Sequence, residues 1–174
     1  MATESKVIRT KRDAQILYSD SGALHSYTVA YEPGDFTYSV PAETTNVFLD
    51  RGKINDDDGY PSVRYGDEQP MTFGHSAYWR DLGDTSVEKT YATLPDLLNR
   101  YEGGYVATNW VSTLSGRSDA FAVNCTLTID GAAFGEADKS LIFPHAAIRG
   151  GGTEGDPSTQ NVTGTSYAAR PTLI

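Results

Sequence analysis

Cysteine and histidine are scarce in this chain, and long apolar runs are missing. Its 174 residues include one cysteine, Cys125, and three histidines. A single cysteine excludes an internal disulfide framework and is typical of proteins made in a reducing compartment. No segment approaches the ~20 apolar residues of a membrane helix, and the N-terminus lacks the apolar stretch of a signal peptide. We therefore expect synthesis in the cytoplasm and no membrane partner.

Positive charge is also in short supply. The chain carries 14 Lys and Arg against 23 Asp and Glu, a formal net charge of −9. Nucleic-acid binding depends on Lys and Arg that displace counterions from phosphates. An acidic chain repels the phosphate backbone, so we do not expect a protein that binds nucleic acid specifically.

Residues that could hold a metal ion are not grouped in the sequence. His25, His75 and His145 are isolated, with no partner at zinc-ligand spacing. The acidic run 55–59 is similar to a calcium loop, but alignment on its glycine places Ile54, which has no side-chain oxygen, at the first ligand position. We expect no metal site and no cofactor.

Catalytic motifs are missing as well. The run Gly150–Thr153 lacks the lysine and spacing of a phosphate-binding loop, no serine lies in a G-x-S-x-G motif, and Cys125 has no nearby histidine. Paired carboxylates of the glycosidase type stay open, because such pairs meet only in three dimensions. The sequence favours a protein that is not an enzyme.

What the chain does contain is alternation. Between Asp119 and Asp130 one set of residues is apolar (Phe121, Val123, Cys125, Leu127, Ile129) and the other is mostly polar (Ala122, Asn124, Thr126, Thr128, Asp130). This two-residue period predicts a half-buried strand, with Cys125 as a small core residue. Met71–Arg80 shows the same pattern.

Other segments indicate further strands and one helix. Short strands are predicted at 14–18, 26–31 and 35–40, the last two as a hairpin through Glu32-Pro33-Gly34, and then at 46–49, 105–113, 139–148 and 159–169. Pro144 predicts a bulge or an edge position. Thr93 can cap a short helix over about 94–102, with Leu94, Leu97, Leu98 and Tyr101 as its apolar stripe.

Two long polar segments complete the organisation. Residues 50–70 are predicted as a long functional loop, and 150–158 as a flexible glycine-rich connection. We expect a polar N-terminal arm (1–13) and one domain (14–174). Its fold class is mainly β: two antiparallel sheets packed as a sandwich or partly closed barrel, flanked by the short helix.

Five short motifs carry a resemblance to a known family. They are Phe36–Pro41, Asn46–Gly52, Arg64–Met71, Trp79–Leu82 and Glu154–Pro157. Together they resemble the tail tube proteins (major tail proteins) of long-tailed bacteriophages, over most of the chain from about Phe36 onward. The resemblance implies crossed antiparallel sheets flanked by a helix, in subunits that close into hexameric rings and stack into the hollow tube through which phage DNA passes.

The resemblance also implies partners and surfaces. The subunit would contact itself, the tape measure and terminator proteins, and DNA that passes without specific binding, in a virion tail assembled from chains made in the bacterial host cytoplasm. The 50–70 segment would reach the adjacent ring, with Arg51, Lys53, Asp56, Asp57, Asp58 and Arg64 as inter-ring candidates. The polar face of the 119–130 strand offers lumen-facing candidates: Asn124, Thr126, Thr128 and Asp130.

Two alternatives stay open. One is a related ring-forming component, a tail terminator or the tube protein of a contractile injection system. The other is a monomeric β-sandwich that binds carbohydrate through exposed residues among its 11 tyrosines.

Overall fold

The computed structural model describes residues 14–22, 25–29, 35–42, 45–50, 53–54, 62–65, 69–78, 94–99, 110–114, 121–131, 135–168 and 170–174. For residues 45–50, 53–54, 62–65, 96 and 99 it describes the backbone alone. These ranges hold eleven strands and one helix: β1 (Ala14–Ser19), β2 (Ser26–Thr28), β3 (Thr37–Ser39), β4 (Thr45–Asp50), β5 (Lys53–Ile54), β6 (Ser62–Tyr65), β7 (Met71–Tyr78), α1 (Leu94–Asn99), β8 (Val123–Ile129), β9 (Lys139–Thr153), β10 (Thr159–Ser166) and β11 (Thr172–Leu173).

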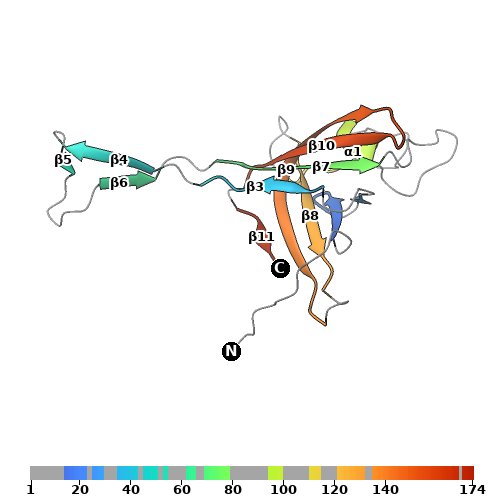
Figure 1. Ribbon diagram of the computed structural model, residues 1–174, viewed down its shortest axis with the longest axis horizontal. Coiled ribbons are helices and arrows are strands. Elements are labelled where there is room, and N and C mark those ends of the chain that lie inside the picture. Colours follow the sequence, from blue (N-terminus) through green and yellow to red (C-terminus); the bar gives the residue numbers. More distant parts are fainter. Residues whose placement is uncertain are drawn as a thin grey trace.

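Eight strands form one antiparallel sheet in the order β2-β1-β8-β9-β10-β7-β3, with β11 paired to β9. The fifteen-residue strand β9 belongs to both parts of this sheet. Its first part, 139–146, pairs with β8, and its last part, 146–153, pairs with β10. In Figure 1, β8 runs steeply across the direction of β7, β10 and β3. The sheet therefore folds over on itself, and β9 passes from one half to the other.

A β-bulge marks the turning point of β9. Between Val123 and Cys125, β8 advances two residues while its partner on β9 advances three, from Ala146 to Phe143. The extra residue lies in the Pro144-His145 pair, and His145 has a φ of 51°. Proline has no N–H to donate to a ladder, and a bulge bends its strand. The bulge predicted at Pro144 is thus confirmed, and it forms the corner of the fold.

The core fills the space between the two halves. Ile16, Val123, Cys125 and Leu127 from one half and Met71, Phe73, Ala77 and Val162 from the other are buried in a single cluster. The ring centroids of Phe73 and Phe143 are 5.2 Å apart across this core. The predicted faces are confirmed for Met71–Tyr78 and for Phe121–Leu127, except that Ala122, expected on the polar face, is fully buried. Ile129, expected on the core face, is only half-buried, and Trp79 and Arg80 lie outside the described residues.

Helix α1 covers one end of the core, where it meets β9. Leu94 and Leu97 are buried, and Leu98 lies so close to Gly150 that a Cβ on Gly150 would be 2.8 Å from a Leu98 methyl carbon. The first glycine of the run 150–152 thus makes room for the helix. The prediction of a flexible connection from residue 150 is wrong for its first part, because β9 continues to Thr153.

A second, three-stranded sheet forms an arm, which we define as β4, β5 and β6. Its order is β5-β4-β6, and no strand of the main sheet pairs with it. In Figure 1 the arm extends away from the body, beyond β3 and β7. The predicted long loop at 50–70 therefore contains β5 and β6, and together with β4 it forms a projecting β-structure.

The fold class predicted from the sequence, a mainly-β sandwich-like fold with one short helix, is confirmed, although its two layers are parts of one open sheet. The expected hairpin of 26–31 with 35–40 is wrong, because β2 pairs with β1 and β3 pairs with β7 at opposite ends of the sheet. Residues 110–113, expected in a strand, are not in one. Strand β11 was not predicted. The N-terminal arm, Thr93 and Tyr101 lie outside the described residues.

Candidate assembly surfaces

A buried polar cluster connects the two halves of the sheet. The Tyr18 hydroxyl on β1 lies 2.7 Å from Nε2 of His75 on β7, and both side chains are buried. Burial lowers the pKa of His75, an effect that the Ser76 carbonyl and Asp35 oppose. In a neutral His75, Nε2 can accept a hydrogen bond from the Tyr18 hydroxyl. Nδ1, 3.4 Å from the Ser76 carbonyl oxygen, then carries the proton and donates a hydrogen bond to that oxygen.

Cys125 lies beside this cluster in the core. It is a free cysteine with no exposed surface. Burial raises the pKa of its thiol, and burial together with Cys125 raises the pKa of Tyr18. A buried, protonated thiol is a poor nucleophile. The cluster therefore has the properties of a core contact between β1, β7 and β8.

The bulge of β9 is held by side chains from three segments. The Asn124 Oδ1 accepts the His145 N–H at 3.4 Å, and the Ser166 hydroxyl donates to the Pro144 carbonyl. Thr113 Oγ1 lies 3.1 Å from His145 Nδ1. Each bond satisfies a backbone or ring atom that the irregular ladder would leave without a partner. His145, isolated in the sequence, thus has a structural place in the corner.

The four lumen-facing candidates share one face of β8, opposite the core. Asn124, Thr126 and Thr128 are half-buried and Asp130 is exposed. Asn124 is engaged with the bulge, and Thr128 Oγ1 lies 3.1 Å from the Ser140 hydroxyl. The structure brings these residues together as predicted from the alternation. They present short side chains, of which only Asp130 carries charge.

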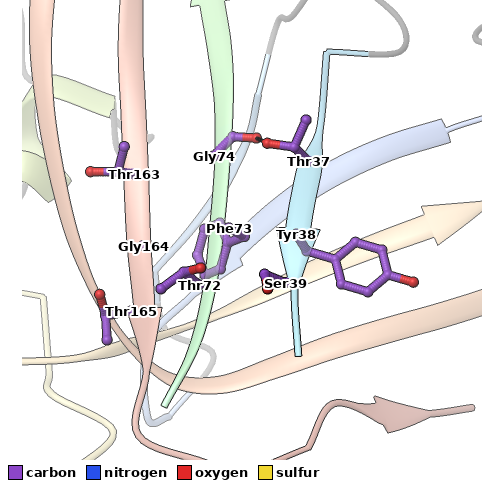
Figure 2. A pocket seen from close by; sticks show the side chains of 9 residues that line it. All are labelled: Thr37, Tyr38, Ser39, Thr72, Phe73, Gly74, Thr163, Gly164 and Thr165. Carbon is purple, nitrogen blue, oxygen red and sulfur yellow. Dashed lines mark hydrogen bonds between the residues drawn. The ribbon is translucent and has the colours of Figure 1, made fainter. Parts of the chain in front are cut away.

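Strands β3, β7 and β10 line an open hollow of about 490 Å³. Figure 2 shows its lining residues, with the Thr37 hydroxyl donating to the Gly74 carbonyl over 3.3 Å and the Tyr38 ring directed away from β7. The described residues that line the hollow carry no carboxylate, amine or guanidinium; they are Thr37, Tyr38, Ser39, Thr72, Phe73, Gly74, Thr163, Gly164 and Thr165. Such a surface offers hydroxyl groups without a fixed charge.

Two of the six inter-ring candidates, Lys53 and Arg64, lie in the arm. Lys53 begins β5 and pairs with Asp50, and Arg64 lies in β6 and pairs with Asn46. Arg51, Asp56, Asp57 and Asp58 lie outside the described residues. The register of β4 with β5 and β6 also reveals an alternation that the loop prediction did not consider, in which Val47 is opposite Val63 and Leu49 is opposite Ile54.

An open sheet edge lies at β11. Leu173 and Ile174 are 71% and 72% exposed, although β11 pairs with β9. In the described part of the chain no strand lies beyond β11, β2 or β3. Exposed apolar side chains on an open edge are typical of sites where another strand is added. This edge could not be predicted from the sequence, because a two-residue strand has no measurable period.

Among the described residues, no three His, Cys, Asp or Glu side chains come together as metal ligands do. No helix in the described part of the chain is both long and apolar enough to cross a membrane.

Comparison with known proteins identifies the fold. No protein-family model matches the sequence, and no curated protein does either. Among solved structures, the chain is similar to the sheath/tube terminator of an extracellular contractile injection system, PVC, in its extended state, with a TM-score of 0.54, 12% identity and 99% of each chain covered. A chain of the baseplate of the anti-feeding prophage (AFP) gives a TM-score of 0.48 at 9% identity, covering 100% of this chain and 97% of that one. The chain thus shares its overall fold with a contractile injection system terminator.

Proposed function

We propose that the protein is a structural subunit of a phage tail or tail-like tube, in which copies close into hexameric rings. The single observation that carries this proposal is the likeness of fold to a sheath/tube terminator over 99% of both chains. The sequence motifs that resemble tail tube proteins support it independently. Under this proposal the chain has no enzymatic activity, and its place is the virion tail.

The open edges and the arm suit such a role. A ring needs heterologous contacts that close, in which each subunit presents two different surfaces. Among the described residues no strand lies beyond β2, β3 or β11 in the main sheet, and pairing between neighbouring subunits there would remove edges that otherwise promote aggregation. The arm would then extend past the ring and meet other tail proteins or the next ring. Charged residues at 51–64 would set its register there.

A terminator is the second candidate, because the structural likeness is to a terminator. The two functions differ in whether rings stack. A tube protein has complementary surfaces on both faces of its ring and forms long tubes, whereas a terminator ring stacks on one face only. Partners differ accordingly: further copies and the tape measure protein in the first case, the end of the tube in the second.

Electron microscopy of the purified protein tests the proposal. Hexameric rings alone favour the terminator, and tubes favour the tube protein. A protein that stays monomeric at every concentration and ionic strength would contradict both functions. It would favour the alternative of a monomeric β-sandwich that binds carbohydrate.

The passage of DNA gives a second test, on the polar face of β8. We propose that Thr126 and Thr128 face the channel, where short neutral side chains give phosphates no partner. Thr126→Lys with Thr128→Lys should leave rings intact while the assembled particles bind added DNA, with an affinity that falls as salt rises.

The control for this test is Thr126→Gln with Thr128→Gln, which has similar bulk and no charge. Equal DNA binding by both double variants and the wild type would exclude this face from the channel. Failure of the lysine variant alone to form rings would place the face in a subunit contact.

A further inference from the structure

The buried side chain of His75 has hydrogen-bonding partners in two directions. Its Nε2 lies 2.7 Å from the hydroxyl of Tyr18, which belongs to the other half of the sheet. Its Nδ1 lies 3.4 Å from the carbonyl oxygen of Ser76. One imidazole ring therefore joins β1 to the backbone of β7, across two strands that are not neighbours in the sheet.

The Nδ1 atom faces the β3 side of β7. In an antiparallel ladder the N–H and C=O of one residue point to the same side. The Ser76 N–H donates to Asp35 Oδ2 at 2.8 Å, so the Ser76 carbonyl, which Nδ1 faces, also points toward the segment that leads into β3. His75 Nδ1 and the Asp35 carboxylate thus meet the same peptide edge.

The two sides of the imidazole differ in the charge that they can offer. In the described chain, the titratable groups around this ring are Tyr18 on β1, Cys125 beside it on β8, and Asp35 before β3. Burial raises the pKa of both Tyr18 and Cys125, so the inner side stays neutral in acid. Burial lowers the pKa of His75, and the Ser76 carbonyl and Asp35 oppose this effect. A charged imidazole is therefore attracted toward Asp35.

Protonation also changes the hydrogen bond to Tyr18. In the neutral ring Nε2 accepts from the Tyr18 hydroxyl, whereas in an imidazolium both nitrogens carry hydrogen and can only donate. The hydroxyl hydrogen must then turn to another acceptor, and the Cys125 sulfur beside it is a weak one. The inner contact is weakened, while the Nδ1–H on the β3 side becomes a charge-assisted donor.

The two partners lie on elements that can respond separately. Tyr18 is in β1, next to the β2 edge, and Asp35 leads into β3, which ends the other half of the sheet. The Phe36 ring, next to Asp35 in the chain, is stacked on the His75 ring with centroids 6.2 Å apart. A shift of the imidazole toward Asp35 would keep this stacking and leave Tyr18.

We propose that His75 is an acid-sensitive switch between these two arrangements. When neutral, it holds Tyr18 and joins the two halves of the sheet; when protonated, it moves toward Asp35, so that β1 loosens while β3 stays held. The switch belongs to the single subunit and does not depend on the proposed function. Because burial lowers the pKa of folded His75, the change occurs as the pH falls below the usual histidine value near 6.5.

NMR spectroscopy of the subunit, titrated from about pH 7.5 downward through the usual histidine value, tests the switch. The ring signals of His75 give its midpoint. At that midpoint the proton contacts from His75 to the Tyr18 ring should be lost and those to the Phe36 ring kept. Protection of amides from hydrogen exchange should fall in β1 and not in β3.

Two results would overturn the switch. One is contact between His75 and Tyr18 that persists in the protonated state. The other is loss of protection in β1 and β3 together, including unfolding of the subunit before His75 titrates, because that is ordinary acid unfolding and not a change of partner.

Variants separate the two arrangements. Asp35→Asn keeps an oxygen for the Ser76 N–H but removes the charge, so the midpoint should move to lower pH and β3 should then lose protection together with β1. His75→Gln should abolish the selective loss in β1. Asp156→Asn, at an exposed carboxylate between β9 and β10, is the matched control and should leave the midpoint unchanged. A selective loss in β1 that survives in His75→Gln, or a β3 that stays protected in Asp35→Asn, would contradict the proposal.

Discussion

At the scale of single residues, packing in the core depends on a missing side chain at Gly164. A Cβ there would collide with the ring of Phe73, which lies directly over this glycine. Gly74 is different, because the nearest atom to a Cβ at that position is the Val162 carbonyl oxygen at 3.5 Å, an ordinary contact. The two glycines lie on the paired strands β7 and β10, so a substitution at Gly74 is a suitable control for one at Gly164.

Gly164→Ala should therefore lower the free energy of unfolding by about 1–3 kcal/mol, the usual cost of overpacking. Gly74→Ala should have little effect. Urea denaturation of each variant measures this difference. Phe73→Leu should recover part of the loss when combined with Gly164→Ala, and strictly additive effects would show that the ring is not the cause.

The Tyr18 and His75 pair leads to a pH dependence. Burial lowers the pKa of folded His75 below its usual value near 6.5, so the unfolded chain binds more protons over the interval between the two values. The contribution of His75 to stability is thus complete above about pH 6.5 and is lost as the pH falls through the lowered pKa of the folded state.

His75→Gln should remove this part of the pH dependence, because an amide can bond Tyr18 without titrating in this range. Urea denaturation between pH 7.5 and 5, compared with the wild type, measures it. His25→Gln, which replaces another buried histidine, is the control. An unchanged pH profile in His75→Gln would mean that protonation of His75 is not linked to folding.

At the scale of elements, the corner of β9 depends on Asn124 and Ser166. Asn124 accepts the His145 N–H, and the Ser166 hydroxyl both donates to the Pro144 carbonyl and accepts the Ala168 N–H. Ser166 is fully buried, so its replacement leaves polar atoms without water or a partner.

Ser166→Ala should cost about 1–3 kcal/mol, the usual penalty for an unsatisfied buried group, and Asn124→Ala somewhat less because it is half-buried. Since both residues hold one bulge, the double variant should be less destabilised than the sum of the single variants. Chemical denaturation gives these values, with Thr126→Ala on the same face as a control. Simple additivity would show that the two contacts act on separate structures.

Strong alternation allowed β7, β8 and their inner faces to be predicted from the sequence, and proline chemistry located the bulge. The pairing of distant strands could not be predicted. Glu32-Pro33-Gly34 suits a turn, but β2 pairs with β1 and β3 with β7, because long-range contacts override a local signal. The arm was not predicted as a sheet, because the polar, glycine-containing segment 50–70 that joins β4 to β6 is typical of a loop. Among the candidate surfaces, the polar face of β8 could be predicted from the alternation. The hollow and the β11 edge could not, because they depend on how distant strands pair.

At the scale of the whole molecule, the two halves of the sheet cannot separate without breaking β9. Each half also contributes side chains to one core. A substitution that destabilises one half should therefore also destabilise the other, and unfolding should be a single transition.

Leu127→Asp tests this cooperativity. It places a carboxylate in the core beside β8, at a cost of several kcal/mol. Tryptophan fluorescence, to which Trp110 in the same core and Trp79 both contribute, and far-UV circular dichroism should shift together to lower denaturant. Thr126→Asp, on the opposite face, is the control. Separate transitions for the two signals would show that the halves unfold independently.

The pairing of distant strands also has a consequence for the order of folding. β8, β9 and β10 follow one another in the chain and pair in that order. The partners of β1 and β7 come much later in the chain, since Ala14 is opposite Ile129 and Met71 is opposite Ser166. At a synthesis rate of about 5–20 residues per second, β1 leaves the ribosome roughly 6–20 s before its partner. In the main sheet, β8, β9 and β10 thus form a local nucleus of the described chain, onto which β1 and β7 close later. Folding of each subunit is therefore expected to finish only after β10 has left the ribosome, and until then the excess of carboxylates should favour a nascent chain that stays in solution.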